Sequence, residues 1–417
     1  ITATVILFII PLLWWTVSTR KKYQKLASER KYEEAVELDP CLPYLQAQER
    51  LLDSNLEVLK ANNLNKDFLY KLPWYLVLGQ EGSGKTSLTN RSNQNFSLTG
   101  VVKAGVRKTA KDPFLAYSLD WWVGNEAVLI DPPGEIISQS DPEGNDSAKP
   151  TLAEQNISAQ ESALRNPNAL PTGLTKRLWD NLIDWLDRNR SRRPLNGIIL
   201  VIDLSSLLNQ SPSDRKTLAI LLRARLFELS KKLGTRLPLY LVLTKFDLID
   251  GFNEFFEKLP RSVREEIFGF TFTLKSVNHF DAWLEEFIAD YDAFVARLNE
   301  QVFDAIGLPH TLEERERLFS FINQLAGMRD MLVGFLTETL GSDSYSTPAL
   351  VRGVYFSSVY QQGLLSNAFV NAAAKTYGLS RLIPQAKETS RGLIYFAQKL
   401  FRDIIYPEAG LAGDNVK

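Results

Sequence analysis

The feature that most constrains this chain is a short apolar run that leads directly into a glycine-rich loop. Residues 74–78 read WYLVL and residues 79–86 read GQEGSGKT, which satisfies every fixed position of the G-x-x-x-x-G-K-[ST] pattern. Such a loop binds phosphate because its backbone N–H groups converge at the start of a helix that follows a strand. The sequence therefore predicts an α/β unit in which this loop joins a buried strand to a helix.

The residue types in the loop suit a nucleoside triphosphate, ATP or GTP, bound together with Mg²⁺. Lys85 supplies a positive charge for the β and γ oxygens, and the hydroxyl of Thr86 is suited to Mg²⁺. The alternative is a glycine-rich turn whose lysine is merely solvated. The predicted nucleotide-binding residues of the loop are Gly79, Gly82, Gly84, Lys85, Thr86 and Ser87.

Further short apolar runs alternate with amphipathic stretches. This alternation predicts an α/β fold of the P-loop NTPase class, similar to a small GTPase, with a largely parallel sheet and helices on both faces. A helical stretch follows, with an apolar stripe that we interpret as a core face, a partner groove being the alternative. The strand candidates are residues 74–78, 115–123, 127–131, 197–203, 237–243, 269–274 and 352–359. The stripe comprises Trp283, Phe287, Tyr291, Phe294, Leu298 and Val302.

A D-x-x-G motif ends the apolar run 127–131. In P-loop proteins the aspartate of this motif, here Asp131, holds Mg²⁺, and the N–H of its glycine, here Gly134, senses the γ-phosphate. The alternative is an aspartate that opens a Pro-Gly turn, which the two intervening prolines favour. The next residue, Glu135, is the candidate catalytic group. Because a carboxylate cannot donate an amide hydrogen bond to water, we expect any turnover to be slow.

The threonine that would complete the Mg²⁺ shell in a switch segment is not singled out by the sequence. Thr99 and Thr109 are both candidates. Arg107 or Lys108 would neutralise phosphate charge, and a solvated basic loop is the alternative. Enzymatic activity is therefore undecided between a slow Mg²⁺-dependent nucleoside triphosphatase and binding without hydrolysis.

A third motif, T-K-x-D, follows the apolar run 237–243. It resembles the N-K-x-D motif of GTPases, in which the aspartate accepts two hydrogen bonds from guanine and the lysine stem lies along the base. We predict base contacts for Thr244, Lys245 and Asp247. Adenine offers no matching pair of donors, but threonine stands where those proteins have asparagine, so ATP and GTP both stay open. Alternatively, Asp247 caps the helix that follows.

The N-terminal residues have the pattern of a membrane span. Residues 1–17 carry no charge, and Arg20, Lys21, Lys22 and Lys25 follow them, so the positive-inside rule places the rest of the chain in the cytoplasm. A cleaved signal peptide and a buried helix are the alternatives. The predicted domains are a truncated transmembrane helix (1–19), a helical stalk (20–71), a P-loop GTPase-like domain (72–275) and a helical extension (276–417).

Composition excludes several classes of protein. The 417 residues contain 48 Lys plus Arg and 49 Asp plus Glu, for a net charge of -1, so we expect no nucleic-acid partner. Cys41 is the single cysteine, and with His279 and His310 as the two histidines a disulfide or a zinc cage is not expected.

Several blocks together resemble the IcmF/TssM family. The resemblance is carried by LPWYLVLGQEGSGKTSL (72–88), DWWVGNEAVLID (120–131), RRPLNGIILVIDLSSLL (192–208), LVLTKFDLIDGF (241–252) and RGVYFSS (352–358). The family's Walker A positions fall on Gly79, Gly84, Lys85 and Thr86, and its strand-end aspartate on Asp131. The family commonly reads D-T-A-G-R at that aspartate, whereas this chain reads D-P-P-G-E. The prolines remove two backbone donors and stiffen the loop, which puts hydrolysis in doubt more than binding.

This resemblance implies a subunit of a bacterial type VI secretion system in the inner membrane, with the present region facing the cytoplasm. The expected partners are the TssL inner-membrane subunit, the TssJ outer-membrane lipoprotein through a periplasmic region absent from this sequence, the baseplate and the membrane. The implied function is a scaffold that binds nucleoside triphosphate and couples slow hydrolysis to assembly or secretion. The alternatives are a nucleotide-independent scaffold with a vestigial P-loop and a stand-alone membrane-anchored GTPase.

Overall fold

A computed structural model gives the fold of most of the chain. The described residues are 21–22, 25, 31–32, 34–36, 38–61, 68–90, 113–115, 117–139, 171–256, 260–277, 279, 281–306, 311–342, 349–359 and 395–413. The predicted membrane span 1–19 lies outside these residues, as do the candidates Thr99, Arg107, Lys108 and Thr109, so each stays a prediction. Among the helices that the structure describes, none is both long enough and apolar enough to cross a bilayer.

Seven strands form one mixed sheet in the order β2-β3-β1-β4-β5-β7-β6. They are β1 (Trp74–Leu78), β2 (Asp120–Val123), β3 (Val128–Asp131), β4 (Gly197–Asp203), β5 (Pro238–Thr244), β6 (Gly269–Thr271) and β7 (Leu350–Phe356). Each of the seven predicted strands is present, although β2 and β6 are shorter than the predicted ranges 115–123 and 269–274. The central strands β3, β1, β4, β5 and β7 run parallel, as the alternation predicted. The two edge strands β2 and β6 are antiparallel, and for β2 the reason is the short turn that joins it to β3.

The strand order places the glycine-rich loop at a topological switch point of the sheet, because β3 lies on one side of β1 and β4 lies on the other. β1 pairs with β3 on one side, Tyr75 opposite Leu129, and with β4 on the other, Leu76 opposite Ile198. In open α/β sheets, ligands bind outside the carboxyl ends of the strands at such a switch point. The loop after β1 and the residues that end β3, β4, β5 and β7 therefore meet at one edge.

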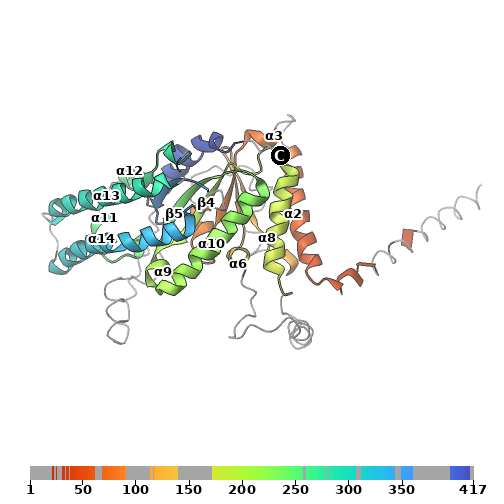
Figure 1. Ribbon diagram of the computed structural model, residues 1–417, viewed down its shortest axis with the longest axis horizontal. Helices are drawn as coiled ribbons and strands as arrows, with labels where there is room; N and C mark the ends of the chain where they lie inside the picture. Colours follow the sequence, from red (N-terminus) through yellow and green to blue (C-terminus); the bar gives the residue numbers. More distant parts are fainter. Residues whose placement is uncertain are drawn as a thin grey trace, which may run out of the picture.

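Helical segments cover both faces of the sheet (Figure 1). The first face packs against α2 (Leu42–Ala61), α8 (Leu174–Asn189), α10 (Pro212–Leu233), α13 (Ala282–Ile306) and α14 (Leu312–Leu340). On the second face, the described residues contribute α4 (Lys85–Asn90) and the C-terminal turns η4 (Leu400–Ile405) and η5 (Pro407–Leu411). The short elements are α3 (Phe68–Lys71), α6 (Gly134–Ser138), α9 (Leu204–Asn209), α11 (Phe252–Phe256), α12 (Arg261–Arg264), η1 (Pro113–Leu115), η2 (Phe246–Leu248) and η3 (Leu274–Val277).

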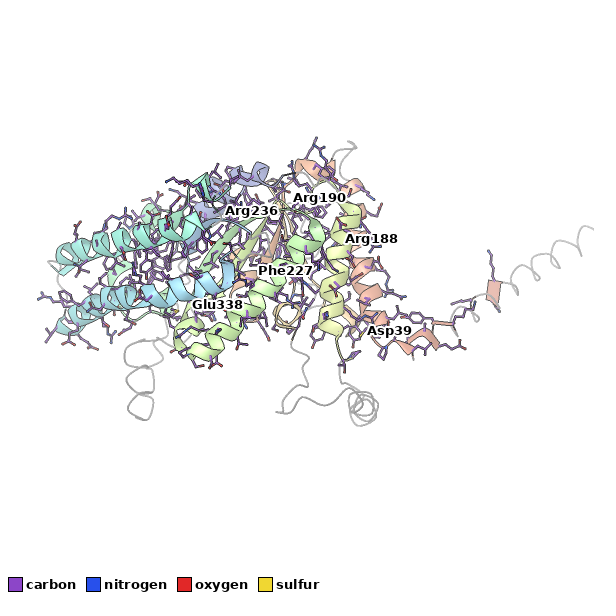
Figure 2. All side chains as sticks on the ribbon, in the orientation of Figure 1. Asp39, Arg188, Arg190, Phe227, Arg236 and Glu338 are labelled. Atoms are coloured by element: carbon purple, nitrogen blue, oxygen red, sulfur yellow. The ribbon has the colours of Figure 1, made fainter. Side chains whose placement is uncertain are left out.

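The helix α2, which falls within the predicted stalk, packs against the domain along α8. Trp185 of α8 donates from Nε1 to Asp53 Oδ1 at 2.8 Å, and its ring lies 5.7 Å from that of Trp121 in β2. Arg188 donates to Glu49 Oε1 at 2.9 Å on the same seam, toward the upper right of Figure 2. These contacts join α2 to the core, and the division of the chain into a stalk and a domain stays a prediction.

The apolar stripe of α13 is buried, which confirms its interpretation as a core face. Phe294 of this stripe stacks on Phe356 of β7 with 6.0 Å between ring centroids, and Tyr291 donates its hydroxyl to Leu325 O of α14 at 2.8 Å. β7 follows the α13–α14 pair in the sequence yet pairs with β5 in the sheet. The sheet thus draws strands from both sides of the predicted boundary at residue 275, which itself stays a prediction.

A buried ion pair fastens the C-terminal turns to the second face. Arg352 of β7, which is 5% exposed, donates to both oxygens of Glu408, from Nη2 at 2.6 Å and from Nε at 2.9 Å. Tyr240 of β5 donates its hydroxyl to the same carboxylate at 2.9 Å, and Tyr75 of β1 donates to Ile405 O at 2.6 Å. Three strands are therefore hydrogen-bonded to residues 405–408.

We predict that Arg352→Ala lowers the free energy of unfolding by about 3 kcal/mol, since removing one partner of a buried pair leaves the other charge uncompensated. The matched control is Arg188→Ala, whose ion pair with Glu49 is exposed and is expected to contribute little. Urea denaturation followed by tryptophan fluorescence measures both. Equal losses in the two variants would contradict a special role for the Arg352–Glu408 pair.

Candidate functional site

The loop between β1 and α4 borders a cavity of about 320 Å³ at the carboxyl edge of the sheet. Its volume lies at the lower end of the range for small-molecule sites. Gly82 and Gly84 have φ angles of 72° and 87°, a region that only glycine adopts without strain. The cavity is lined by Gly82, Ser83, Gly84, Lys85, Thr86, Ser87, Thr244, Lys245 and Val359. Two separate sequence motifs are thus brought together on one cavity wall.

Lys85 is held inside the loop by backbone oxygens. Its Nζ donates to Gly79 O at 2.9 Å and lies 3.9 Å from Asp131 Oδ1, and its side chain is 7% exposed. The charge is therefore sheltered from bulk solvent. In this environment, its attraction to an anion is stronger than it would be in water. This environment fits the predicted role of Lys85 in holding a phosphate.

Thr86 and Asp131 form the pair predicted for Mg²⁺. The hydroxyl of Thr86 donates to Asp131 Oδ2 at 2.8 Å, and Asp131 is fully buried at the end of β3. Within the described residues, no group of three or more His, Cys, Asp and Glu side chains is arranged to hold a metal ion alone. Mg²⁺ keeps several waters and takes its other ligands from phosphate, so two protein oxygens suit it.

Thr244 ties the end of β5 to the glycine-rich loop. Its hydroxyl lies 2.6 Å from Ser83 O and 3.1 Å from Ile202 O, and because one proton serves one strong bond, the shorter contact to the loop dominates. Lys245 has a left-handed backbone, with φ of 57°, and its Nζ donates to Asp203 Oδ2 at 2.6 Å. The ends of β4 and β5 are thereby joined beside the cavity.

Asp247 is placed differently from its two partners in the T-K-x-D motif. It lies in η2, is 3% exposed, and does not line the cavity. Burial raises the pKa of Asp247 above the usual carboxyl value, although the nearby hydroxyl of Ser358 and the charge of Lys245 act in the opposite direction. No side-chain cap from Asp247 to α11 is present among the described contacts, and its base-reading role stays a prediction.

The D-x-x-G segment contacts the loop through its backbone. A Cβ atom placed on Gly134 would lie 2.0 Å from Glu81 N, so only glycine fits at the start of α6. Glu135, the candidate catalytic group, is partly exposed, and like Gly134 it does not line the cavity. The structure therefore brings Asp131 into contact with Thr86, and the predicted catalytic residue Glu135 does not line the cavity.

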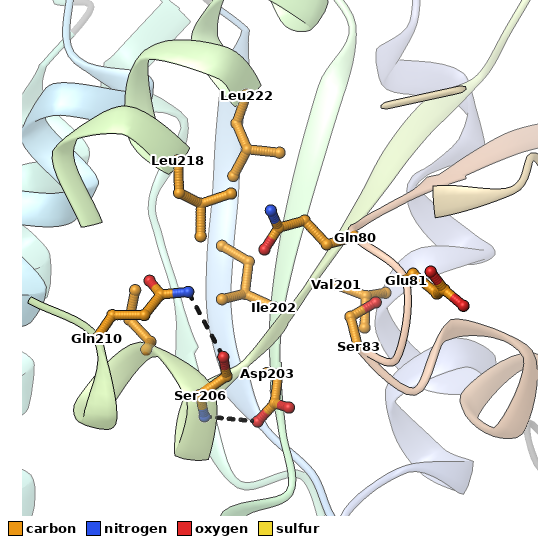
Figure 3. A pocket seen from close by; sticks show the side chains of 11 residues that line it. Gln80, Glu81, Ser83, Val201, Ile202, Asp203, Ser206, Gln210, Leu218 and Leu222 are labelled. Carbon is orange, nitrogen blue, oxygen red and sulfur yellow. Dashed lines mark hydrogen bonds between the residues drawn. The ribbon is translucent and has the colours of Figure 1, made fainter. Parts of the chain in front are cut away.

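A second, smaller cavity lies behind the loop and is enclosed by β4, α9 and α10 (Figure 3). Its volume of about 40 Å³ is the scale of ordered water. The side chain of Gln80 points toward it from the loop, with Leu218 and Leu222 of α10 opposite. Ser83 borders both cavities, and its buried Oγ forms no hydrogen bond within the described part of the chain.

Sequence reasoning missed three residues at this site. Ser83 is a variable position of the loop pattern, and its carbonyl accepts the bond from Thr244. Ser358 lies near enough to Asp247 to influence its pKa, and Val359 lines the cavity, because both follow β7 at the same sheet edge as the loop. The signal that would have indicated Ser358 and Val359 is the serine pair directly after the apolar run of residues 353–356, at the end of a parallel strand.

Comparisons with known proteins place the sequence among secretion components. The model of the IcmF-related N-terminal domain matches residues 174–417. The type VI secretion system component TssM1 of Pseudomonas aeruginosa is 32% identical over 369 residues, which cover 88% of this chain and 30% of that protein. The chain thus spans less than a third of the length of this curated relative.

Solved structures give only weak similarity. A GTP-binding protein from the archaeon Sulfolobus solfataricus in complex with GDP is 16% identical, with 49% of this chain and 50% of that chain covered and a TM-score of 0.19. A signal recognition particle receptor complex, SRb-GTP/SRX, from Chaetomium thermophilum is 13% identical, with 73% and 99% covered and a TM-score of 0.22. These scores are too low to establish a shared fold.

We predict that Thr244→Val loosens the glycine-rich loop. The variant loses the hydroxyl that donates to Ser83 O, and an unsatisfied buried carbonyl costs about 1–3 kcal/mol. Thr244→Ser, the matched control, keeps the hydroxyl and should retain most of the stability. Amide hydrogen exchange across residues 79–86 measures the effect. Unchanged protection in the valine variant would show that this bond does not hold the loop.

We also predict that Asp247 makes stability fall with rising pH. Because the folded state raises the pKa of this carboxyl, it binds the proton more tightly than the unfolded state does. Its contribution to the free energy of unfolding therefore declines as pH rises from about 4 through the raised pKa.

Asp247→Asn removes this titration. We expect the variant to be more stable than the native protein near neutral pH and to lose the advantage below about pH 4. Denaturant titrations across this range provide the measurement, with Asp290→Asn on the exposed face of α13 as the control. A variant that is less stable at neutral pH would contradict the prediction.

Proposed function

The chain belongs to the IcmF/TssM family, and from this membership we propose that it is a cytoplasmic scaffold domain of the type VI secretion membrane complex whose glycine-rich loop binds a nucleotide. The observation that carries the nucleotide part is the cavity of about 320 Å³ that the loop shares with Thr244 and Lys245. The scaffold part is supported by the match to TssM1, which covers 88% of this chain.

Each component of a nucleotide with Mg²⁺ has residues suited to it. Lys85 and the loop N–H groups suit the phosphates, and the Thr86–Asp131 pair suits Mg²⁺. When bound, Mg²⁺ supplies charge neutralisation for the phosphate oxygens. Lys245 also lines the cavity and suits contact with a base, and the choice between ATP and GTP depends on how Asp247 takes part.

The scaffold role implies specific partners, which we propose on the basis of family membership. They are the TssL inner-membrane subunit, the type VI baseplate and, through a region outside this sequence, the TssJ outer-membrane lipoprotein. The proposed location is the cytoplasmic side of the bacterial inner membrane, with residues 1–19 as the anchor. The α13–α14 pair and α2 present long helices on the domain that suit contacts with such partners.

A second candidate function is a scaffold in which the loop is a structural remnant. It is favoured by Lys85, whose Nζ already donates one hydrogen bond to Gly79 O, and by Glu135, which does not line the cavity. The two prolines between Asp131 and Gly134 also restrict the motion that coupled hydrolysis needs. These observations weigh against the coupling of nucleotide hydrolysis to assembly or secretion more than against nucleotide binding.

We predict that the native protein binds Mg²⁺ with ATP or GTP and that Lys85→Ala weakens binding at least tenfold, because the sheltered positive charge is lost. Titration with fluorescently labelled ATP and GTP measures this. Lys216→Ala, which removes an exposed lysine from α10, should leave binding unchanged. Absence of binding to either nucleotide at millimolar concentration would contradict the nucleotide part of the proposal.

Asp131→Asn distinguishes the two candidate functions. If hydrolysis drives assembly, this variant should lose both Mg²⁺-dependent phosphate release and secretion in cells. Loss of phosphate release with normal secretion would instead support the structural remnant. Normal folding of the variant is checked by its circular dichroism and thermal midpoint.

A further inference from the structure

We propose that the site in this conformation selects a nucleoside diphosphate over the triphosphate, and that the closed contact between Gly134 and Glu81, together with the carboxylates of Glu81 and Glu135, sets this preference. The inference rests on the proposed function, since it takes a nucleotide as the ligand of the glycine-rich loop. It goes beyond that function in specifying whether the site prefers a diphosphate or a triphosphate and which residues determine this preference.

Only the second half of the glycine-rich loop is open to the cavity, and the first half is closed off from it. Its lining contains the second half of the loop, residues 82–87, together with the residues that end β5 and follow β7. Gln80 and Glu81 from the first half do not line it and instead border the smaller cavity behind the loop. A ligand in the open half reaches the helix start at Lys85 and the tips of the strands but not the first half of the loop.

The closed half is where a third phosphate belongs. In P-loop proteins the glycine of D-x-x-G senses the γ-phosphate, which therefore lies between this glycine and the loop. Here the Cβ position of Gly134 is 2.0 Å from Glu81 N and 2.6 Å from Gln80 C. With a bond of about 1.5 Å to that position, Gly134 Cα lies within about 3.5 Å of Glu81 N.

This separation excludes a phosphate group. Atoms about 3.5 Å apart are already in van der Waals contact, and a phosphate oxygen needs about 2.9 Å to the donor nitrogen of Glu81 alone, so no phosphate fits between Gly134 Cα and Glu81 N. A triphosphate can enter only when α6 moves away from the loop. The two prolines that precede Gly134 fix their φ angles and oppose that movement.

Charge acts in the same direction as the steric closure. Burial raises the pKa of Tyr117, and the negative charges of Glu135 and Glu81 raise it further, so both carboxylates lie close enough to act on the same hydroxyl. Within the described residues, neither Glu81 nor Glu135 forms an ion pair. The added negative charge of a third phosphate would be repelled there, whereas a diphosphate in the cavity meets the positive charge of Lys85, which lines it.

The experiment compares diphosphates and triphosphates on the full chain by isothermal titration calorimetry in the presence of Mg²⁺. The probes are ADP, GDP and non-hydrolysable analogues of ATP and GTP, so that slow turnover does not confuse the result. We expect the diphosphate of the preferred base to bind at least tenfold more tightly than its triphosphate analogue. Glu81→Gln/Glu135→Gln should tighten triphosphate binding several-fold more than diphosphate binding.

Glu126→Gln, in the exposed turn between β2 and β3, is the matched control and should keep the native ratio. Equal or tighter binding of the triphosphate by the native protein overturns the inference and leaves the proposed function standing. Binding of neither form overturns both. A ratio that is the same in the native protein and in Glu81→Gln/Glu135→Gln overturns the assignment to these carboxylates. Because both replacements are isosteric and partly or fully exposed, folding should be preserved, and the thermal midpoint checks this.

Discussion

The parallel pairing of β1 with β3 and β4 is the constraint on which the rest of the site depends. Because five parallel strands end at the same edge, residues far apart in sequence meet there. Asp131 ends β3, Asp203 ends β4 and Thr244 ends β5, and each contacts the loop or its neighbours through its side chain. A slip of one residue in any of these strands would turn the contacting side chain to the other face of the sheet.

The elements of the sheet could be predicted from sequence because each strand is a short apolar run with polar flanks. The same signal does not give strand order. β7 lies between β5 and β6 although the α13–α14 pair separates it from both in sequence. Tertiary contacts such as that of Phe294 with Phe356 stabilise this placement. Likewise, the pattern of α2 predicted a helix but not its packing, which arises from hydrogen bonds such as Trp185 to Asp53.

In the candidate site, too, some residues could be predicted from the sequence and others could not. Pattern matching found Lys85, Thr86 and Asp131 because phosphate and Mg²⁺ chemistry restricts those positions to a few residue types. Ser83 and Val359 were not predicted. Ser83 contributes its backbone carbonyl and Val359 contributes part of the cavity lining, and nearly any residue type can provide either. The backbone contact of Gly134 with Glu81 also left no sequence signal, since glycine is expected in D-x-x-G for another reason.

The cavity thus joins the second half of the glycine-rich loop to the ends of β5 and β7, and the contact between Gly134 and Glu81 closes the place where a γ-phosphate is expected. This arrangement suits the proposed secretion scaffold that holds a nucleotide more than a motor that consumes one. The most direct test is a crystal structure grown with excess Mg²⁺ and a nucleoside diphosphate. The account predicts phosphate density against residues 82–87, with Thr244 still bonded to Ser83 O. A cavity filled by side chains, or nucleotide bound elsewhere on the chain, would contradict it.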